Sequence, residues 1–158
     1  AAMEVTAIAS VAGTLPPGAP LVRRPTFESP HHSATMAALV GGGSGQIRPG
    51  ALCRAHLGVL FLDEAPEFPR AVLDTLRQPL ERGEVTIHRA NGSATFPCRA
   101  QLVLAANPCP CASAAGDTAC TCSPLERRRY QSRLSGPLLD RIDLNVTLPA
   151  VSRAAWLD

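Results

Sequence analysis

Apolar and polar residues alternate along the chain in runs that predict both strands and helices. Short apolar runs typical of buried strands lie at residues 59–62 (VLFL), 101–106 (QLVLAA) and 143–148 (DLNVTL). Helical spacing predicts helices at residues 2–12, at 69–82 and, with a strongly basic start, from 125 to 142. The second of these is expected to lose regularity near Pro79. Strands alternating with helices predict an α/β fold with a largely parallel sheet flanked by helices.

A second pattern predicts a β-hairpin and a loop-rich region. Residues 84–96 (EVTIHRANGSATF) alternate around Asn91-Gly92, a strong hairpin signal. Residues 21–50 are rich in Pro, His, Ser and Gly, and within them residues 33–40 are expected to form one or two helical turns.

The stretch GVLFLDEAPEF at residues 58–68 places two carboxylates at the end of a predicted buried strand. In such folds ligands bind beyond the carboxyl ends of the strands. Asp63 could hold Mg²⁺ through water, and Glu64 could deprotonate a water for attack on a phosphate. Asn107, which comes after the neighbouring strand, could hold that water or sense the phosphate. This predicts a Walker B motif of an ATPase; the alternative is that both carboxylates only cap the helix near Pro69.

Composition narrows the classes of protein. No stretch of about 18 apolar residues could span a membrane, and no export signal is present, so a cytoplasmic location is expected. The net charge of +2 is too small to predict a nucleic-acid surface by itself. All fifteen basic residues are arginine. Because a P-loop needs a lysine in GxxxxGK[ST], the chain contains no Walker A motif.

Four of the six cysteines gather in NPCPCASAAGDTACTCS (residues 107–123), and we call them the cysteine cluster: Cys109, Cys111, Cys120 and Cys122. Two CxC pairs could bind Zn²⁺ tetrahedrally. The alternative is a metal-free, flexible loop. Cys53 and Cys98 stand alone and are interpreted as buried apolar fillers.

Four blocks of sequence carry a family resemblance: FESPHHSATMAALVGGGS, GVLFLDEAPEFPRAVLDTLRQPLERGEV, LVLAANPCPC and RLSGPLLDRIDL. Together they resemble the magnesium-chelatase-like AAA+ ATPases, in the ComM/YifB branch, from about Ala2 to Val151. The resemblance implies a partial AAA+ core at residues 1–151, without Walker A or lid. It also implies a cysteine-rich loop insertion at 108–123 and the start of a following segment at 152–158.

The resemblance implies a role for each matching residue. Asp63 would be the Walker B magnesium ligand, Glu64 the catalytic base and Asn107 sensor 1. Arg141 matches the arginine finger that reaches the neighbour's ATP; its alternative is a salt bridge with Asp140 or Asp143. The family's P-loop lies upstream of Met3, so this chain alone is expected not to hydrolyse ATP.

Some residues depart from the family pattern. Glu28 stands where the family often has Arg, and Ala112 stands where it usually has Gly. The pair His31-His32 is interpreted as part of a loop held by the Ser29 and Ser33 hydroxyls, because adjacent histidines rarely share one metal.

Three functions remain open for the parent protein or the chain. The resemblance implies a hexameric ring that uses ATP and Mg²⁺ to drive DNA branch migration in recombination and natural transformation (competence). In such a ring the predicted hairpin, with Arg89 and Arg99 nearby, would contact DNA phosphates. The second is a metal-chelatase subunit that powers Mg²⁺ insertion into a porphyrin. The third, for this chain alone, is an inactive fragment stapled by zinc.

Overall fold

The computed structural model describes residues 1–42, 47–89, 92–111 and 120–148. Its centre is a parallel sheet in the order β1 (Phe27–Glu28), β4 (Val59–Leu62) and β7 (Gln101–Leu104). The register aligns Glu28 with Leu60, and Leu62 with Leu104. β4 pairs in parallel with both β1 and β7, so the carboxyl ends of the three strands point to the same edge of the sheet. The predicted α/β class with a parallel sheet is confirmed.

Short helices surround this sheet. They are α1 (Ala2–Ala12), α2 (Met36–Leu39), α3 (Ala51–Arg54), the 3₁₀ helix η1 (Ala65–Glu67), α4 (Arg70–Asp74), α5 (Arg77–Arg82), α6 (Pro124–Gln131) and α7 (Gly136–Leu139). The helix predicted at 2–12 is confirmed, and the turn predicted within 33–40 appears as α2, where the Thr35 hydroxyl accepts from the Ala38 N–H (3.2 Å). The core holds buried side chains from β4, α3, α4 and α7, among them Leu60, Leu62, Leu52, Leu73 and Leu138.

The helix predicted over residues 69–82 is two helices. α4 ends at Asp74, and α5 begins at Arg77. Pro79 therefore lies in the first turn of α5, and the irregularity predicted near it falls just before that turn, at residues 75–76. A proline ring clashes with the carbonyl four residues earlier, here that of Thr75, so one helix could not continue through this point. In a first turn the missing N–H costs nothing, because that donor has no partner inside the helix.

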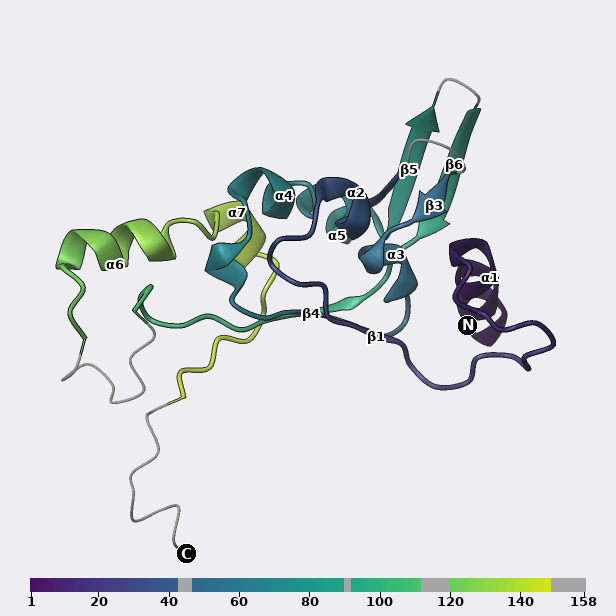
Figure 1. The fold of residues 1–158 in the computed structure, drawn as a ribbon, viewed down its shortest axis with the longest axis horizontal. Helices are drawn as coiled ribbons and strands as arrows, with labels where there is room; N and C mark the ends of the chain where they lie inside the picture. The colour runs from purple at the N-terminus through teal and green to yellow at the C-terminus, as the bar shows by residue number, and fades with distance from the viewer. Residues whose placement is uncertain (43–46, 90–91, 112–119, 149–158) are drawn as a thin grey trace, which may run out of the picture.

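The predicted hairpin is confirmed as β5 (Glu84–Arg89) paired antiparallel with β6 (Gly92–Pro97). Its turn residue Asn91 lies outside the described residues. Val85 and Ile87 pack into the core, while the Thr86 and Thr95 hydroxyls meet across the strands on the other face (2.9 Å). The hairpin projects from the body of the molecule (Figure 1). A second small pair, β2 (Gly41–Gly42) with β3 (Arg48–Pro49), had no signal in the sequence pattern.

The C-terminal part departs from the expected pattern. The helix predicted from 125 to 142 is two helices: α6 ends at Gln131, and the four-residue α7 follows. Residues 143–148, expected to form a strand, are not paired with any strand in the described part of the chain. Leu144, Val146 and Leu148 are 82%, 72% and 85% exposed. Their alternation has the strand period, but no neighbouring strand among the described residues is in place to receive it.

No helix within the described ranges has both the length and the apolar character needed to cross a membrane.

Candidate functional site

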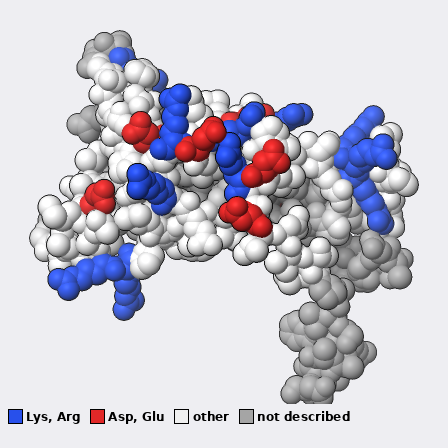
Figure 2. All heavy atoms as spheres, turned by 180° about the vertical axis from the view of Figure 1, so that it is seen from behind, with Lys and Arg blue, Asp and Glu red and all other residues white. Residues whose placement is uncertain are grey.

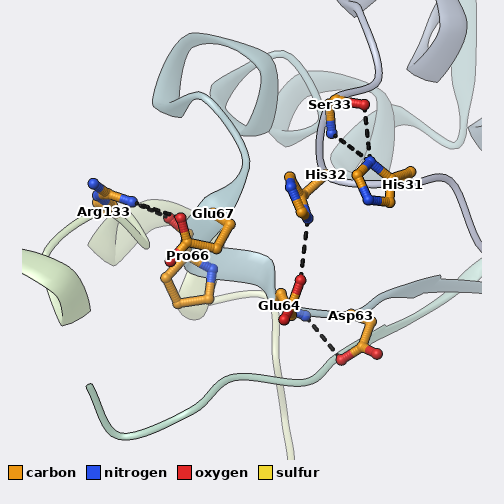
Figure 3. A network of polar contacts seen from close by, with 8 residues as sticks. All are labelled: His31, His32, Ser33, Asp63, Glu64, Pro66, Glu67 and Arg133. Carbon is orange, nitrogen blue, oxygen red and sulfur yellow. Dashed lines mark hydrogen bonds and ion pairs between the residues drawn. The ribbon is translucent and has the colours of Figure 1, made fainter. Parts of the chain in front are cut away.

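The site is built at the carboxyl edge of the sheet, where β4 ends. Leu60 and Leu62 are fully buried, and β4 is hydrogen-bonded on both sides, by β1 and β7. This fixes the strand, so Asp63 and Glu64 emerge at a defined place on its end. Both side chains are exposed to solvent, so their carboxylate oxygens can bind a metal ion or accept hydrogen bonds from that side (Figure 3).

The backbone at this corner is held in an unusual conformation. Glu64 has a φ of 49°, in the left-handed region that non-glycine residues rarely adopt. Contacts on both sides hold it there: the Asp63 Oδ1 accepts from the Glu64 N–H (2.9 Å), and the Ala65 N–H donates to the Ala105 carbonyl (2.8 Å). The second bond joins the corner to the segment that leads from β7 to Asn107.

The capping alternative for the two carboxylates is wrong. Glu64 is the residue before η1, but its side chain makes no capping bond there. α4 is preceded by Pro69 and also has no side-chain cap. The carboxylate oxygens of Asp63 and Glu64 therefore cap neither of these helices. The Asp63 Oδ1 accepts the hydrogen bond from the Glu64 N–H described above.

Asn107 leaves the sheet at the same edge. Leu104 aligns with Leu62, and the Ala105 N–H still donates to the Leu62 carbonyl (3.0 Å). Asn107 comes two residues later and is half-buried. The structure thus brings the end of β7 beside the end of β4, as the parallel pattern predicts.

A residue that the sequence pattern did not assign to the site contacts Glu64. The His32 Nδ1 lies 3.1 Å from the Glu64 Oε2, and the His32 ring meets Phe68 edge-on at 6.4 Å between centroids (Figure 3). His31 instead turns its Nδ1 to the Ser33 hydroxyl (2.8 Å), and its ring lies tilted by 36° against the His32 ring, with 4.0 Å between the centroids. The Ser33 part of the predicted loop is therefore present, but His32 belongs to the site. The sequence pattern gave no signal for this, because β1, the strand that places the two histidines at this edge, is only two residues long.

Further ion pairs surround the edge. The Arg133 Nη1 donates to the Glu67 Oε2 (3.1 Å) and to the Pro66 carbonyl (3.2 Å), which ties the segment after α6 to η1. Glu28 makes a two-pronged pair with Arg54, from Nε (3.1 Å) and Nη2 (2.8 Å). Glu28 is thus occupied by a structural contact.

Arg141 lies away from this corner, in a different contact. Its Nη2 donates to the Glu81 Oε1 (2.9 Å), beside an open cavity of about 350 Å³ lined also by Asp74, Arg77 and Pro137. The side chain is 46% exposed. The partners proposed in the salt-bridge alternative, Asp140 and Asp143, are not the observed one; the observed partner comes from α5.

The cysteine cluster comes together in space. The Cys109 Sγ lies 3.1 Å from the Cys111 Sγ and 3.4 Å from the Cys120 Sγ, and all four sulfurs lie within 4.8 Å of one another. Hydrogen bonding to the neighbouring thiols, first of Cys111 and then of Cys120, raises the pKa of Cys109 to about 12. Ala112 and the rest of the intervening loop (residues 112–119) lie outside the described residues. Cys53 and Cys98 lie outside the cluster and are buried. Burial raises the pKa of the Cys53 thiol to about 11 and that of the Cys98 thiol to about 12, as expected for thiols that fill space in the apolar core.

Comparison with known proteins agrees with this arrangement. The sequence pattern of the family described as "Magnesium chelatase, subunit ChlI" matches residues 1–156. An uncharacterized protein of Mycobacterium tuberculosis, Rv2897c, is 56% identical over 98% of this chain and 30% of its own length. The competence protein ComM of Haemophilus influenzae is 54% identical over 82% of this chain and 25% of its own length.

Among solved structures, NtrX from Brucella abortus in complex with ADP superposes with a TM-score of 0.48 at 19% identity, over 74% of this chain and 23% of NtrX. The chain spans between a quarter and a third of the length of the relatives named above. A family pattern that covers residues 1–156, together with relatives above 50% identity, settles the family. The chain belongs to the family of the magnesium chelatase subunit ChlI, and its relatives include ComM.

Proposed function

We propose that this chain is the central part of an ATP-driven motor that works on DNA as a hexameric ring in the cytoplasm. The observation that carries the proposal is the corner after β4, where two exposed carboxylates emerge beside the end of β7. Two hard anionic ligands at the carboxyl edge of a parallel sheet suit a nucleotide with its magnesium ion. In the proposed division, residues 1–151 form the partial AAA+ core, 108–123 its cysteine-rich insertion and 152–158 the start of a further segment.

Each residue of the site has one role in the proposal. Asp63 would hold Mg²⁺ through water, and Glu64 would accept a proton from the attacking water. Asn107 would orient that water and sense the terminal phosphate. Magnesium would supply charge neutralisation on the phosphate oxygens when ATP is bound.

The proposal assigns the P-loop to another part of the parent protein, because the chain has no lysine. Without the backbone cradle and that lysine, only the magnesium side of the site is present. The 158-residue chain alone is therefore expected to bind ATP weakly and not to hydrolyse it. Calorimetric titration with ATP and Mg²⁺ measures this, and micromolar affinity would contradict it.

Two projecting elements support a DNA substrate. The β5–β6 hairpin extends from the body, with Arg89 exposed at the end of β5 and Arg99 exposed just after β6. On the opposite side of the molecule, arginine side chains gather over α6 (Figure 2), whose sequence holds Arg127, Arg128 and Arg129. Guanidinium groups suit phosphate contacts. The name of the relative ComM, a competence protein, agrees with a role in handling incoming DNA by branch migration during recombination.

The second candidate is a chelatase subunit that drives Mg²⁺ insertion into a porphyrin, which the description of the matching family favours. The cysteine cluster and the EAPEF continuation of the strand favour the DNA motor instead. The two candidates share the ATP site and differ in what stimulates it.

An ATPase assay of the full-length parent protein tests the proposal. Branched or single-stranded DNA should raise the rate of hydrolysis and should be unwound or migrated in an ATP-dependent way. Hydrolysis that ignores DNA but responds to a porphyrin and a partner subunit would favour the chelatase. A parent protein that hydrolyses no ATP under any of these conditions would contradict both.

A further inference from the structure

The cysteine cluster joins two parts of the chain that are separated by eight undescribed residues. Cys109 and Cys111 lie in the turn after β7, and Cys120 and Cys122 lie directly before α6. Cys109 is only 3% exposed, whereas Cys111 is exposed, so the cluster lies at the surface with one thiol turned inward.

The spacing of the sulfurs fits a single tetrahedral ion. Zinc–sulfur bonds of about 2.3 Å to four corners of a tetrahedron put the sulfurs about 3.8 Å apart. The distances from Cys109 to Cys111 (3.1 Å), from Cys109 to Cys120 (3.4 Å) and from Cys111 to Cys120 (3.5 Å) are slightly shorter than this. No pair in the cluster exceeds 4.8 Å. No disulfide joins the cysteines in the described part of the chain, so none removes a ligand from the set.

The chemistry of the ligands selects the metal. Four thiolates are soft donors, and a closed tetrahedral set of four sulfurs is typical of structural zinc. Hard ions such as Mg²⁺ prefer oxygen ligands, so the ion proposed at Asp63 would not compete for this cluster. A set with four protein ligands also leaves no open position for a substrate, which points to a structural role.

We infer that the cysteine cluster holds one Zn²⁺ and that this ion fastens the start of α6 to the end of β7. Cys109 comes two residues after Asn107, and Cys122 directly precedes Ser123, the N-cap of α6. One ion thus fixes both the turn after the proposed sensor and the first turn of the basic helix. This inference does not depend on the proposed ATPase.

One hydrogen bond outside the cluster also joins α6 to the turn after β7. The Gln131 Nε2 donates to the Pro108 carbonyl (3.2 Å), which links the far end of α6 to the same turn. The Ser123–Glu126 capping box acts within α6 alone. By composition, residues 112–119 (ASAAGDTA) have only small side chains. A metal that binds here would couple binding to local folding.

Metal analysis of the chain, purified under reducing conditions without a histidine tag, tests the first half of the inference. About one zinc per chain is expected. Cys120→Ser should lower the content to a small fraction of that. Two matched controls should keep the metal: Cys53→Ala, which removes a buried thiol elsewhere, and Ser123→Ala, which weakens the α6 cap but keeps all four sulfurs. If Cys120→Ser does not fold, cobalt titration of the unmodified chain should give the absorption bands of tetrahedral cobalt thiolate.

Three results would overturn the zinc site. One is a folded, metal-free chain whose four cluster thiols react with a thiol reagent in one phase, even after zinc is supplied. Another is a full equivalent of zinc on Cys120→Ser. The third is iron in place of zinc. For the fastening role, removal of zinc by a chelator should speed amide hydrogen exchange in α6 and residues 105–111, and leave the β5–β6 hairpin unchanged. Unchanged exchange in α6 would contradict that role.

Discussion

At the scale of single residues, Glu64 is the most constrained position of the site. A non-glycine residue with left-handed backbone costs roughly 1–2 kcal/mol. The chain tolerates this because the hydrogen bonds to Asp63 and from Ala65 hold the backbone on both sides. The result is that the carboxylate turns outward toward His32, away from the core. Strain stored at one acidic residue is typical of a functional site.

In the full-length protein, Glu64→Gln should leave ATP binding intact and reduce hydrolysis by about 10²–10⁴-fold, because an amide keeps the shape but accepts no proton. Glu67→Gln is the matched control, since Glu67 lies three residues away and its carboxylate pairs with Arg133. Steady-state ATPase rates with nucleotide-binding measurements compare the two. Normal turnover by Glu64→Gln would remove Glu64 as the base.

His32 is expected to orient Glu64, and its removal should lower kcat more than it changes KM. Both side chains are partly exposed, at 33% and 50%, so the contact is worth at most about 1 kcal/mol and the loss should be a few-fold. His32→Asn, which retains a polar group at a similar distance, should recover part of what His32→Ala loses. His31→Ala removes the ring that lies against His32 but no contact with Glu64, so it should cost less activity than His32→Ala. Equal rates for His31→Ala and His32→Ala would contradict the positioning role.

At the scale of elements, the sequence pattern predicts helices and strands that depend on their own residues. It misses those that depend on pairing with a distant part of the chain. The β4 strand and the hairpin arise from apolar runs and alternation, and both are present. Residues 143–148 have the same alternation, but a strand needs a partner, and sequence pattern does not supply one. The loss of helical regularity predicted near Pro79 is present, and it falls at residues 75–76 because the clash of a proline acts four residues upstream. β1 has only two residues, which is too short to show the alternation of a strand in the sequence. Because β1 was not predicted, the place of His32 at the edge of the sheet was not predicted either.

His56 links α3 to the end of the hairpin and should make folding sensitive to pH. It is 2% exposed, and its Nδ1 accepts from the Arg99 N–H (3.2 Å), so the neutral ring is the form that fits. Burial lowers the pKa of His56 from the ordinary 6.5. The unfolded chain then binds more protons below pH 6.5, so stability present at higher pH is lost as the pH falls through the folded pKa.

Urea unfolding of the chain at about pH 7.5 and about pH 5.5, on either side of the ordinary histidine pKa, should therefore show lower stability at the acidic pH. His56→Asn should reduce this difference, because an amide oxygen accepts the Arg99 N–H without titrating. His88→Asn, a histidine exposed on β5, should leave the difference unchanged. If His56→Asn showed the full wild-type difference, other groups would be responsible for it.

At the scale of the whole molecule, the proposed ATP site needs a P-loop, and the chain has no lysine to form one. The sequence predicted that β4 and β7, which lead to Asp63, Glu64 and Asn107, end at the same edge of the sheet, because parallel strands bring their ends together whatever lies around them. The roles of the three residues stay predictions. The roles proposed for Arg141 and for a P-loop would depend on parts of the parent protein or on a neighbouring subunit. No pattern within the 158 residues encodes those parts. In this chain Arg141 is held by Glu81 on the surface, 46% exposed. An exposed arginine held by one carboxylate is suited to exchange that partner for a phosphate.

Arg141→Ala in the full-length protein should keep ATP binding and reduce hydrolysis by about 10³-fold or more, the scale of an arginine finger. Glu81→Gln separates this from the salt-bridge alternative, since it removes the same ion pair and leaves the arginine. A finger predicts near-normal hydrolysis for Glu81→Gln. A structural salt bridge predicts equal, small effects for both variants, of about 1 kcal/mol or less in stability.

Mixed rings then test whether Arg141 acts on the neighbouring subunit's ATP. Subunits carrying Arg141→Ala keep Glu64, and subunits carrying Glu64→Gln keep Arg141. Where a Glu64→Gln subunit presents its arginine to an Arg141→Ala neighbour, one complete site forms, so coexpressed variants should hydrolyse ATP although each variant alone does not. The recovered rate should vary with the ratio of the two variants, as the number of complete interfaces does. Mixed rings that stay inactive while still binding ATP and assembling normally would mean that Arg141 does not act across the subunit boundary.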